Sequence, residues 1–143
     1  MPNNDTKEPN KDVDLNKNSR YEKSSLTDEQ LIFYQEKLTK AMLDEKLYLN
    51  PTLSLTSLST YLKLPNHHLT QVFSVQINQT FYQYINSLRI AYACQLLKSE
   101  EANMNFEELA DQSGFNSKPS FNRQFKLIMN CTPSEYRISV QNK

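Results

Sequence analysis

Residues 109–136 read LADQSGFNSKPSFNRQFKLIMNCTPSEY, and residues 58–84 read LSTYLKLPNHHLTQVFSVQINQTFYQY. The two stretches align along their whole length once a single extra residue is allowed in the second. The matched pairs are Leu58 with Leu109, Leu69 with Phe121, Phe73 with Phe125, Asn78 with Asn130, Thr80 with Thr132 and Tyr84 with Tyr136. Because apolar positions and helix-end residues agree together, the sequence indicates two copies of one supersecondary unit.

Each copy predicts a short helix, a tight turn and a second helix. In the first copy Ser54 can cap a helix, and Pro65 ends it because the residue before a proline avoids the α conformation. In the second copy Asn105 caps the short helix and Gly114 supplies the turn. The second helices are predicted over 66–77 and 117–129. Each ends at an asparagine, which tolerates the left-handed conformation common at helix ends.

Further helices are predicted on both sides of the repeat. Apolar residues at helical spacing predict a linking helix over 80–98, and a capping box at Thr27 and Gln30 begins a helix over 28–45. Thr132, Pro133 and Glu135 start a short terminal helix. The predicted organisation is a disordered polar tail (1–25), a connector helix (26–47), a first helix-turn-helix lobe (48–79), a linker helix (80–99) and a second lobe (100–143).

Composition supports an all-α fold. The chain has one glycine in 143 residues, and alternation of apolar and polar residues is rare. No apolar run approaches the roughly 18 residues of a membrane span, and no secretory signal layout is present, so we expect a cytoplasmic chain without membrane contact. The formal net charge is zero, with a small basic excess from Leu55 onward, so charge by itself does not indicate nucleic acid.

The order of helix, turn and helix is the arrangement that places a second helix in the DNA major groove. With Leu69 and Phe73 inward in one copy, and Phe121 and Phe125 inward in the other, each second helix keeps a polar face. Asn, Gln and Arg side chains can pair bidentately with base edges. The candidate base readers are His67, Thr70, Gln71, Lys118, Asn122 and Arg123. The candidate phosphate contacts are Lys63, Ser74, Ser117 and Lys126, and Lys118 also suits a phosphate.

Other classes of function are weighed against this one. No constellation of side chains suits catalysis, no set of ligands beside His67 and His68 suits a metal, and no cofactor is implied, so we expect a protein that is not an enzyme. A polar helix face can also be merely solvated. A second hypothesis is a helical protein-interaction module that recruits RNA polymerase or a partner regulator, with weak or no DNA reading. The neutral net charge motivates that hypothesis.

From about Leu31 to Arg137 the chain resembles the DNA-binding domain of AraC/XylS-type transcription regulators. The resemblance rests on Leu58-Ser59, Leu69-Thr70, Leu88-Arg89, Gly114-Phe115-Asn116-Ser117, Phe121-Asn122-Arg123 and Thr132-Pro133-Ser134-Glu135-Tyr136-Arg137. It implies about seven helices in two homeodomain-like lobes, with both second helices entering successive major-groove segments of double-stranded DNA. It also implies RNA polymerase and a second copy of the protein, paired through missing or N-terminal segments, as candidate partners.

A narrower resemblance links Tyr48-Leu49-Asn50-Pro51 and Ile85-Asn86-Ser87 to the output domains of membrane-spanning sensor regulators of this family. It implies that the helix over 28–45 joins a sensing region to this domain, and that the full-length protein is tethered to the inner membrane. The sequence departs from the family at Gln71, where arginine is usual, and at Asn78 and Asn130, where glycine is usual. Since no Lys or Arg lies between Lys63 and Arg89, the first lobe should supply hydrogen bonds but little positive charge.

Overall fold

The computed structural model describes residues 26–99 and 103–141, and these form helices without any β-strand. The all-α fold is therefore confirmed over these ranges, while the predicted disordered tail over 1–25 lies outside the described residues. The elements are α2 (Asp28–Glu45), η1 (Leu47–Leu49), α3 (Leu55–Leu62), α4 (Asn66–Gln71), η2 (Val72–Ile77), α5 (Phe81–Lys98), α6 (Phe106–Gln112), α7 (Lys118–Met129) and α8 (Pro133–Gln141).

Local capping sets where these helices begin. Thr27, Ser54, Thr80 and Asn105 each accept a hydrogen bond from the backbone N–H three residues on, and each completes a reciprocal capping box. Asn78 and Asn130 end the two second helices in the left-handed conformation, with φ of 62° and 61°. The predicted helix starts and ends are therefore confirmed, because both depend on interactions within a few residues of the chain.

The second helix of the first unit departs from a regular α-helix. It is α-helical through Gln71 and continues as the π-helix η2 from Val72 to Ile77. The bond from the Asn78 N–H to the Phe73 carbonyl, 2.7 Å long, spans five residues as a π-helix requires. The predicted sides of this segment nevertheless hold, because Phe73 is buried and Ser74 is exposed.

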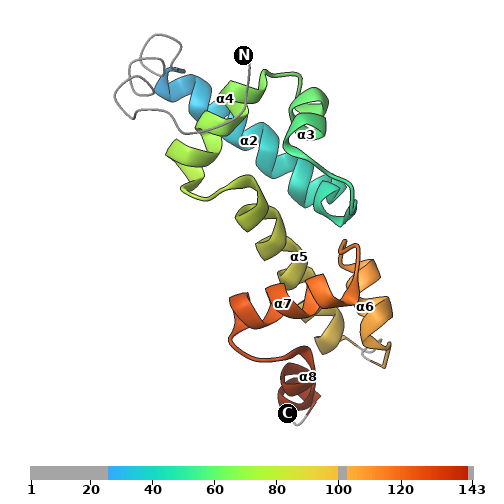
Figure 1. The fold of residues 1–143 in the computed structure, drawn as a ribbon. Helices are drawn as coiled ribbons and strands as arrows, with labels where there is room; N and C mark the ends of the chain where they lie inside the picture. Colours follow the sequence, from blue (N-terminus) through green and yellow to red (C-terminus); the bar gives the residue numbers. More distant parts are fainter. Residues whose placement is uncertain (1–25, 100–102, 142–143) are drawn as a thin grey trace.

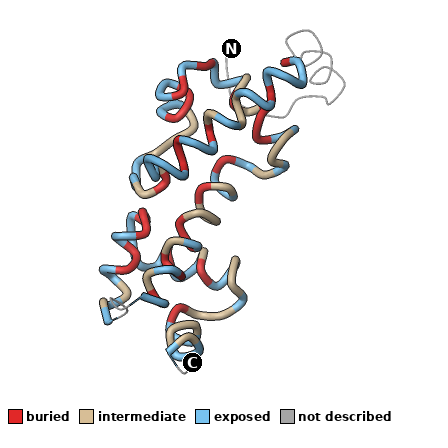
Figure 2. Tube along the Cα trace, turned by 180° about the vertical axis from the view of Figure 1, so that it is seen from behind, coloured by how far each residue is buried: buried red, intermediate tan, exposed pale blue. Residues whose placement is uncertain are grey.

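Two hydrophobic cores share α5. Phe81 and Ile85 in its first half pack with α2, α3, α4 and η2 into a first core. We call the elements around this core, η1 included, the first lobe. Ile90, Ala93 and Leu97 in its second half pack with α6, α7 and α8 into a second core, the second lobe. Figure 1 shows the two lobes at the two ends of α5, and Figure 2 shows buried positions in both lobes and along α5 between them.

The helix predicted as a connector is part of the first core. Leu31, Leu38 and Met42 of α2 are almost fully buried among the side chains of the first lobe. The Lys37 ammonium also donates a 2.8 Å hydrogen bond to the Leu62 carbonyl at the end of α3. Since α2 packs on the helix-turn-helix unit itself, its position and that of the unit are mechanically linked.

Candidate nucleic-acid interface

In the second lobe, aromatic packing fixes which face of α7 points outward. Phe121 and Phe125 are fully buried, with ring centroids 5.6 Å apart. Phe115 packs on Phe121 at 5.5 Å, and Tyr136 of α8 packs on Phe125 at 5.7 Å. Rings held from both sides leave α7 little freedom to rotate about its axis, so the opposite face is held toward solvent.

That outward face carries the residues predicted from the sequence. Lys118, Asn122, Arg123 and Lys126 are all exposed, and we call them the α7 surface. Ser117, also exposed, caps the helix by accepting a 3.3 Å hydrogen bond from the Ser120 N–H. The α7 surface thus presents three cationic side chains and one amide beside a helix N-terminus, a set that can pair with base edges and with phosphates.

In the first lobe the outward face is narrower than predicted. His67 and Ser74 are exposed, Thr70 is half-buried, and we call these three the α4 surface. Gln71, predicted as a base reader on the same face, is only 5% exposed, so its side chain is not presented to a partner in this structure. The prediction that Gln71 shares the exposed face is therefore wrong.

The helix α2 packs on residues that flank Gln71 in the sequence. His68, one turn before Gln71 on the same side, stacks on Tyr34 of α2 with ring centroids 6.2 Å apart. Further along, the Gln76 amide donates a 3.0 Å hydrogen bond to the Gln35 side chain, also in α2. Since α2 lies along this side of α4 and η2, the side chains on it are covered by an element that a helical projection of 66–77 does not include.

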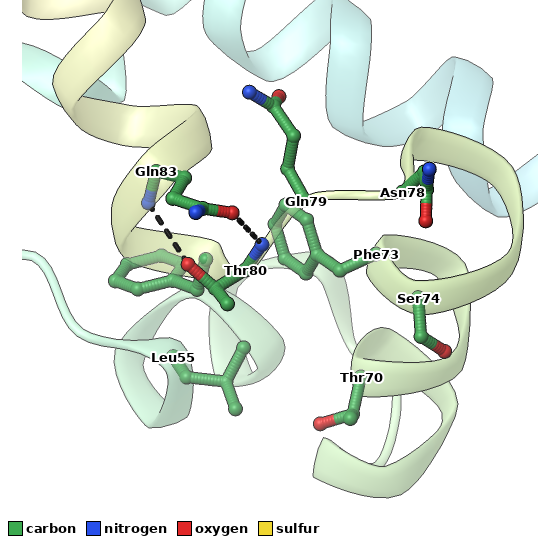
Figure 3. A pocket seen from close by; sticks show the side chains of 9 residues that line it. Leu55, Thr70, Phe73, Ser74, Asn78, Gln79, Thr80 and Gln83 are labelled. Carbon is green, nitrogen blue, oxygen red and sulfur yellow. Dashed lines mark hydrogen bonds between the residues drawn. The ribbon is translucent and has the colours of Figure 1, made fainter.

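A cavity of about 420 Å³ adjoins the α4 surface (Figure 3). Thr70 and Ser74 line one side of it, and Leu55 at the start of α3 lines another. The capping box of α5 closes the third side, where the Thr80 N–H donates to Gln83 Oε1 at 2.9 Å and the Gln83 N–H donates to Thr80 Oγ1 at 3.1 Å. The starts of two helices therefore flank the hydroxyls of the α4 surface.

The remaining candidate, Lys63, lies in the turn between α3 and α4. It is exposed and adopts a left-handed conformation with φ of 62°. Lys63 is therefore a solvent-exposed cation in the turn before the α4 surface, which itself carries no Lys or Arg.

Sequence reasoning missed two exposed apolar residues on the second helices. Val75 is 56% exposed and Leu127 is 70% exposed. They occupy equivalent positions of the repeat, and Leu127 lies one turn after Arg123 on the outward side of α7. The alignment of the two units contained this signal, because an apolar residue recurs there next to the polar faces rather than on the buried side.

The repeat lies within a region that matches a known protein family. A model described as a helix-turn-helix domain matches residues 58–139. An uncharacterised HTH-type transcriptional regulator of Staphylococcus aureus (strain COL) is 33% identical over 93 residues, 64% of this chain and 12% of that protein. The uncharacterised regulator YfiF of Bacillus subtilis (strain 168) is 28% identical over 100 residues, 70% of this chain and 31% of that protein. The chain thus spans a small part of these relatives' own length.

Solved structures share the two-lobed fold. The C-terminal domain of the two-component response regulator yesN from Fusobacterium nucleatum has a TM-score of 0.62 at 27% identity, over 72% of this chain and 98% of that one. A transcriptional regulator from Chromobacterium violaceum, described as AraC-type DNA-binding domain-containing, has a TM-score of 0.63 at 26% identity, over 74% and 93%. The AdpA DNA-binding domain, solved in complex with a target DNA, shares the fold with a TM-score of 0.65 at 18% identity, over 76% and 93%.

None of the helices in residues 26–99 and 103–141 combines the length and apolar character needed to cross a bilayer.

The comparisons with known proteins favour DNA reading over the alternative of a protein-interaction module. The family match covers both units of the repeat and the α5 helix between them. The chain belongs to the AraC-type family of helix-turn-helix domains, and its fold is that of DNA-binding transcription regulators.

Proposed function

We propose that this chain is the sequence-specific DNA-binding domain of a transcription regulator. Its α4 and α7 surfaces would enter successive major-groove segments on one side of the duplex. The observation that carries the proposal is the α7 surface, where Lys118, Asn122, Arg123 and Lys126 are all exposed on a helix whose other side is locked by buried phenylalanines. A major groove is wide enough for such a helix, and arginine and asparagine match the donor and acceptor patterns of guanine and adenine.

The α4 and α7 surfaces are expected to make different contributions to DNA binding. The α7 surface carries three positive charges, so it supplies both base pairing and much of the phosphate neutralisation. The α4 surface offers the hydroxyls of Thr70 and Ser74 and the imidazole of His67, which form hydrogen bonds but add no fixed charge. Phosphate contact near the first lobe would come from Lys63 in the preceding turn. We therefore expect the second lobe to dominate affinity and both lobes to contribute to sequence choice.

Selection of sites from random DNA, followed by mobility shifts on the selected site, tests the proposal. Arg123→Ala should weaken binding by about 1–3 kcal/mol and relax base choice locally, whereas Lys126→Ala should weaken binding to all sequences and flatten the salt dependence. If about four phosphates are neutralised, log affinity should fall against log salt with a slope near −3.6. Lys40→Ala is the matched control, since Lys40 is an exposed cation on α2 that pairs with Asp44 at 3.6 Å.

Selection that enriches no sequence at low salt would contradict the proposal. So would equal losses of affinity for Arg123→Ala and Lys40→Ala. Gln71→Ala gives an internal check on the α4 surface, because the burial of Gln71 leads us to expect a loss of stability without a change in base preference.

The full-length protein is proposed to act in the cytoplasm, where bacterial DNA lies, and to carry a sensing region. That region would connect to α2, whose Tyr34 and Gln35 contact His68 and Gln76 of the first unit. Tethering to the inner membrane, pairing of two copies and contact with RNA polymerase belong to this part of the proposal. A reporter assay that compares the full-length protein with residues 26–143 alone checks it, because regulation by the signal should require the longer chain.

A further inference from the structure

We propose that Arg89 and the Gly114 turn form an interlobe lock, which fixes the spacing and rotational phase of the α4 and α7 surfaces. The lock would thereby set which separation of two half-sites the domain can read. Its consequence for DNA rests on the proposed function, whereas its mechanical role can be measured without DNA. Figures 1 and 2 show the turn between α6 and α7 facing the segment of the first lobe that contains η1.

Arg89 holds the first lobe from the middle of α5. It is 8% exposed, and its Nε donates a 2.6 Å hydrogen bond to the Tyr48 carbonyl while a terminal nitrogen donates a 3.0 Å bond to the Asn50 carbonyl. The guanidinium is a rigid planar fork, so two bonds to neighbouring carbonyls fix its orientation as well as its distance. The η1 segment is thereby tied to α5 at the point where the first core gives way to the second.

The same guanidinium touches the second lobe. Its Cζ lies 5.6 Å from the centroid of the Phe115 ring, within the range of a cation–π contact. Phe115 in turn packs on Phe121 of α7 with ring centroids 5.5 Å apart. A chain of three contacts therefore runs from the first-lobe backbone through Arg89 and Phe115 to the recognition helix of the second lobe.

Gly114 brings the two backbones directly together. A Cβ at this position would lie 2.6 Å from the Tyr48 carbonyl oxygen and 2.9 Å from the Leu49 Cα, so the turn rests on η1 without space for a side chain. Two residues later, the Asn116 amide donates a 3.3 Å hydrogen bond to the Pro51 carbonyl. Ser117, the N-cap of α7, follows at once. The docked turn therefore fixes where α7 begins relative to the first lobe.

Such a lock matters because DNA couples distance to rotation. One added base pair moves a half-site by about 3.4 Å and turns it by about 35° about the duplex axis. Two recognition surfaces held rigidly cannot follow both changes, so a shifted site loses the contacts of one surface. If the lock is loosened, the two surfaces are joined only through α5, and they can follow part of the change in distance and rotation. We therefore expect spacing selectivity to depend on Arg89.

The test compares Arg89→Met with Arg137→Met. Arg137 is the matched control because it also donates to a backbone carbonyl, that of Met104 at 2.7 Å, and lies over a Phe ring, Phe106 at 4.2 Å, but within the second lobe alone. Nitroxide labels are attached through Val75→Cys and Leu127→Cys, with Cys94→Ala and Cys131→Ser in the background, and the distance distribution is measured by pulsed electron resonance without DNA. Arg89→Met should broaden the distribution, and Arg137→Met should leave its width unchanged.

Binding to the selected site and to the same site with one base pair inserted between the half-sites gives the second measurement. The wild type should prefer the original spacing by at least about 10-fold, and Arg89→Met should lower that ratio severalfold while Arg137→Met preserves it. Arg89→Lys, which keeps the charge but loses the fork, should give an intermediate ratio. Asn116→Ala serves as a milder second variant if Arg89→Met does not fold.

Equal distribution widths for Arg89→Met and Arg137→Met would overturn the lock. The lock would also be overturned if Arg89→Met still selected the DNA sequence and kept the wild-type preference for the original spacing over the inserted one. If Arg89→Met broadens the distance distribution but the wild-type chain selects no DNA sequence, the lock is supported and the proposed function is rejected. The two failures are therefore distinguishable.

Discussion

Replacing Gly114 with alanine tests how tightly the two lobes are docked. Gly114 has φ of +92°, a backbone conformation that costs an L-residue about 1–3 kcal/mol. The added Cβ would also meet two backbone atoms, the Tyr48 oxygen at 2.6 Å and the Leu49 Cα at 2.9 Å, and neither can rotate away. Overpacking of this kind costs about 1–3 kcal/mol.

Together these effects predict a loss of stability of about 2–6 kcal/mol. This loss is reduced by about 0.4–1 kcal/mol because alanine restricts the unfolded chain. Urea unfolding followed by circular dichroism at 222 nm measures it. The matched control is Asn130→Ala, at an exposed helix end with φ of 61°, where a left-handed alanine costs about 1 kcal/mol. The difference between the two variants isolates the clash with the first lobe. If Gly114→Ala lost no more stability than Asn130→Ala, the docking inferred from these distances would be refuted.

Three further predictions concern stability. Lys46→Gly should raise the free energy of unfolding by about 0.5–1 kcal/mol in urea unfolding, because Lys46 ends α2 in the left-handed conformation with φ of 51°. Phe125→Ala should cost about 3–5 kcal/mol by the same measurement, since it empties a fully buried site beneath α7, and a smaller loss would mean that the second core can collapse around the gap. Burial, followed by the charge of neighbouring His67, lowers the pKa of His68, so the unfolded chain takes up a proton at a higher pH than the folded protein does. Stability should therefore fall as the pH drops from about 6.5 toward the folded pKa, and His68→Phe, which keeps a ring against Tyr34, should remove that part of the pH dependence of the urea midpoint.

Local interactions made much of the architecture predictable from the sequence. Helix starts follow from capping side chains such as Ser54 and Asn105, which satisfy backbone N–H groups three residues away. The outward face of α7 follows from Phe121 and Phe125, because residues four apart share one side of a helix. The structure confirms these features, and the contacts of individual residues with DNA stay predictions.

Other features depend on elements far apart in the chain, so no helical projection could find them. Gln71 is buried, and α2, more than 25 residues upstream, contacts His68 and Gln76 on either side of it in the sequence. The π-helix over Val72–Ile77 was also not predicted, because apolar spacing in the sequence indicated a regular helix there. Arg89 reads in the sequence as one cation of a linking helix, yet its hydrogen bonds reach residues 41 and 39 positions away. Composition and spacing therefore determined that two helix-turn-helix units exist and where their helices begin and end. Tertiary packing alone decided which polar side chains are left for a partner and how the two units are held against each other, because both depend on which surfaces distant segments cover.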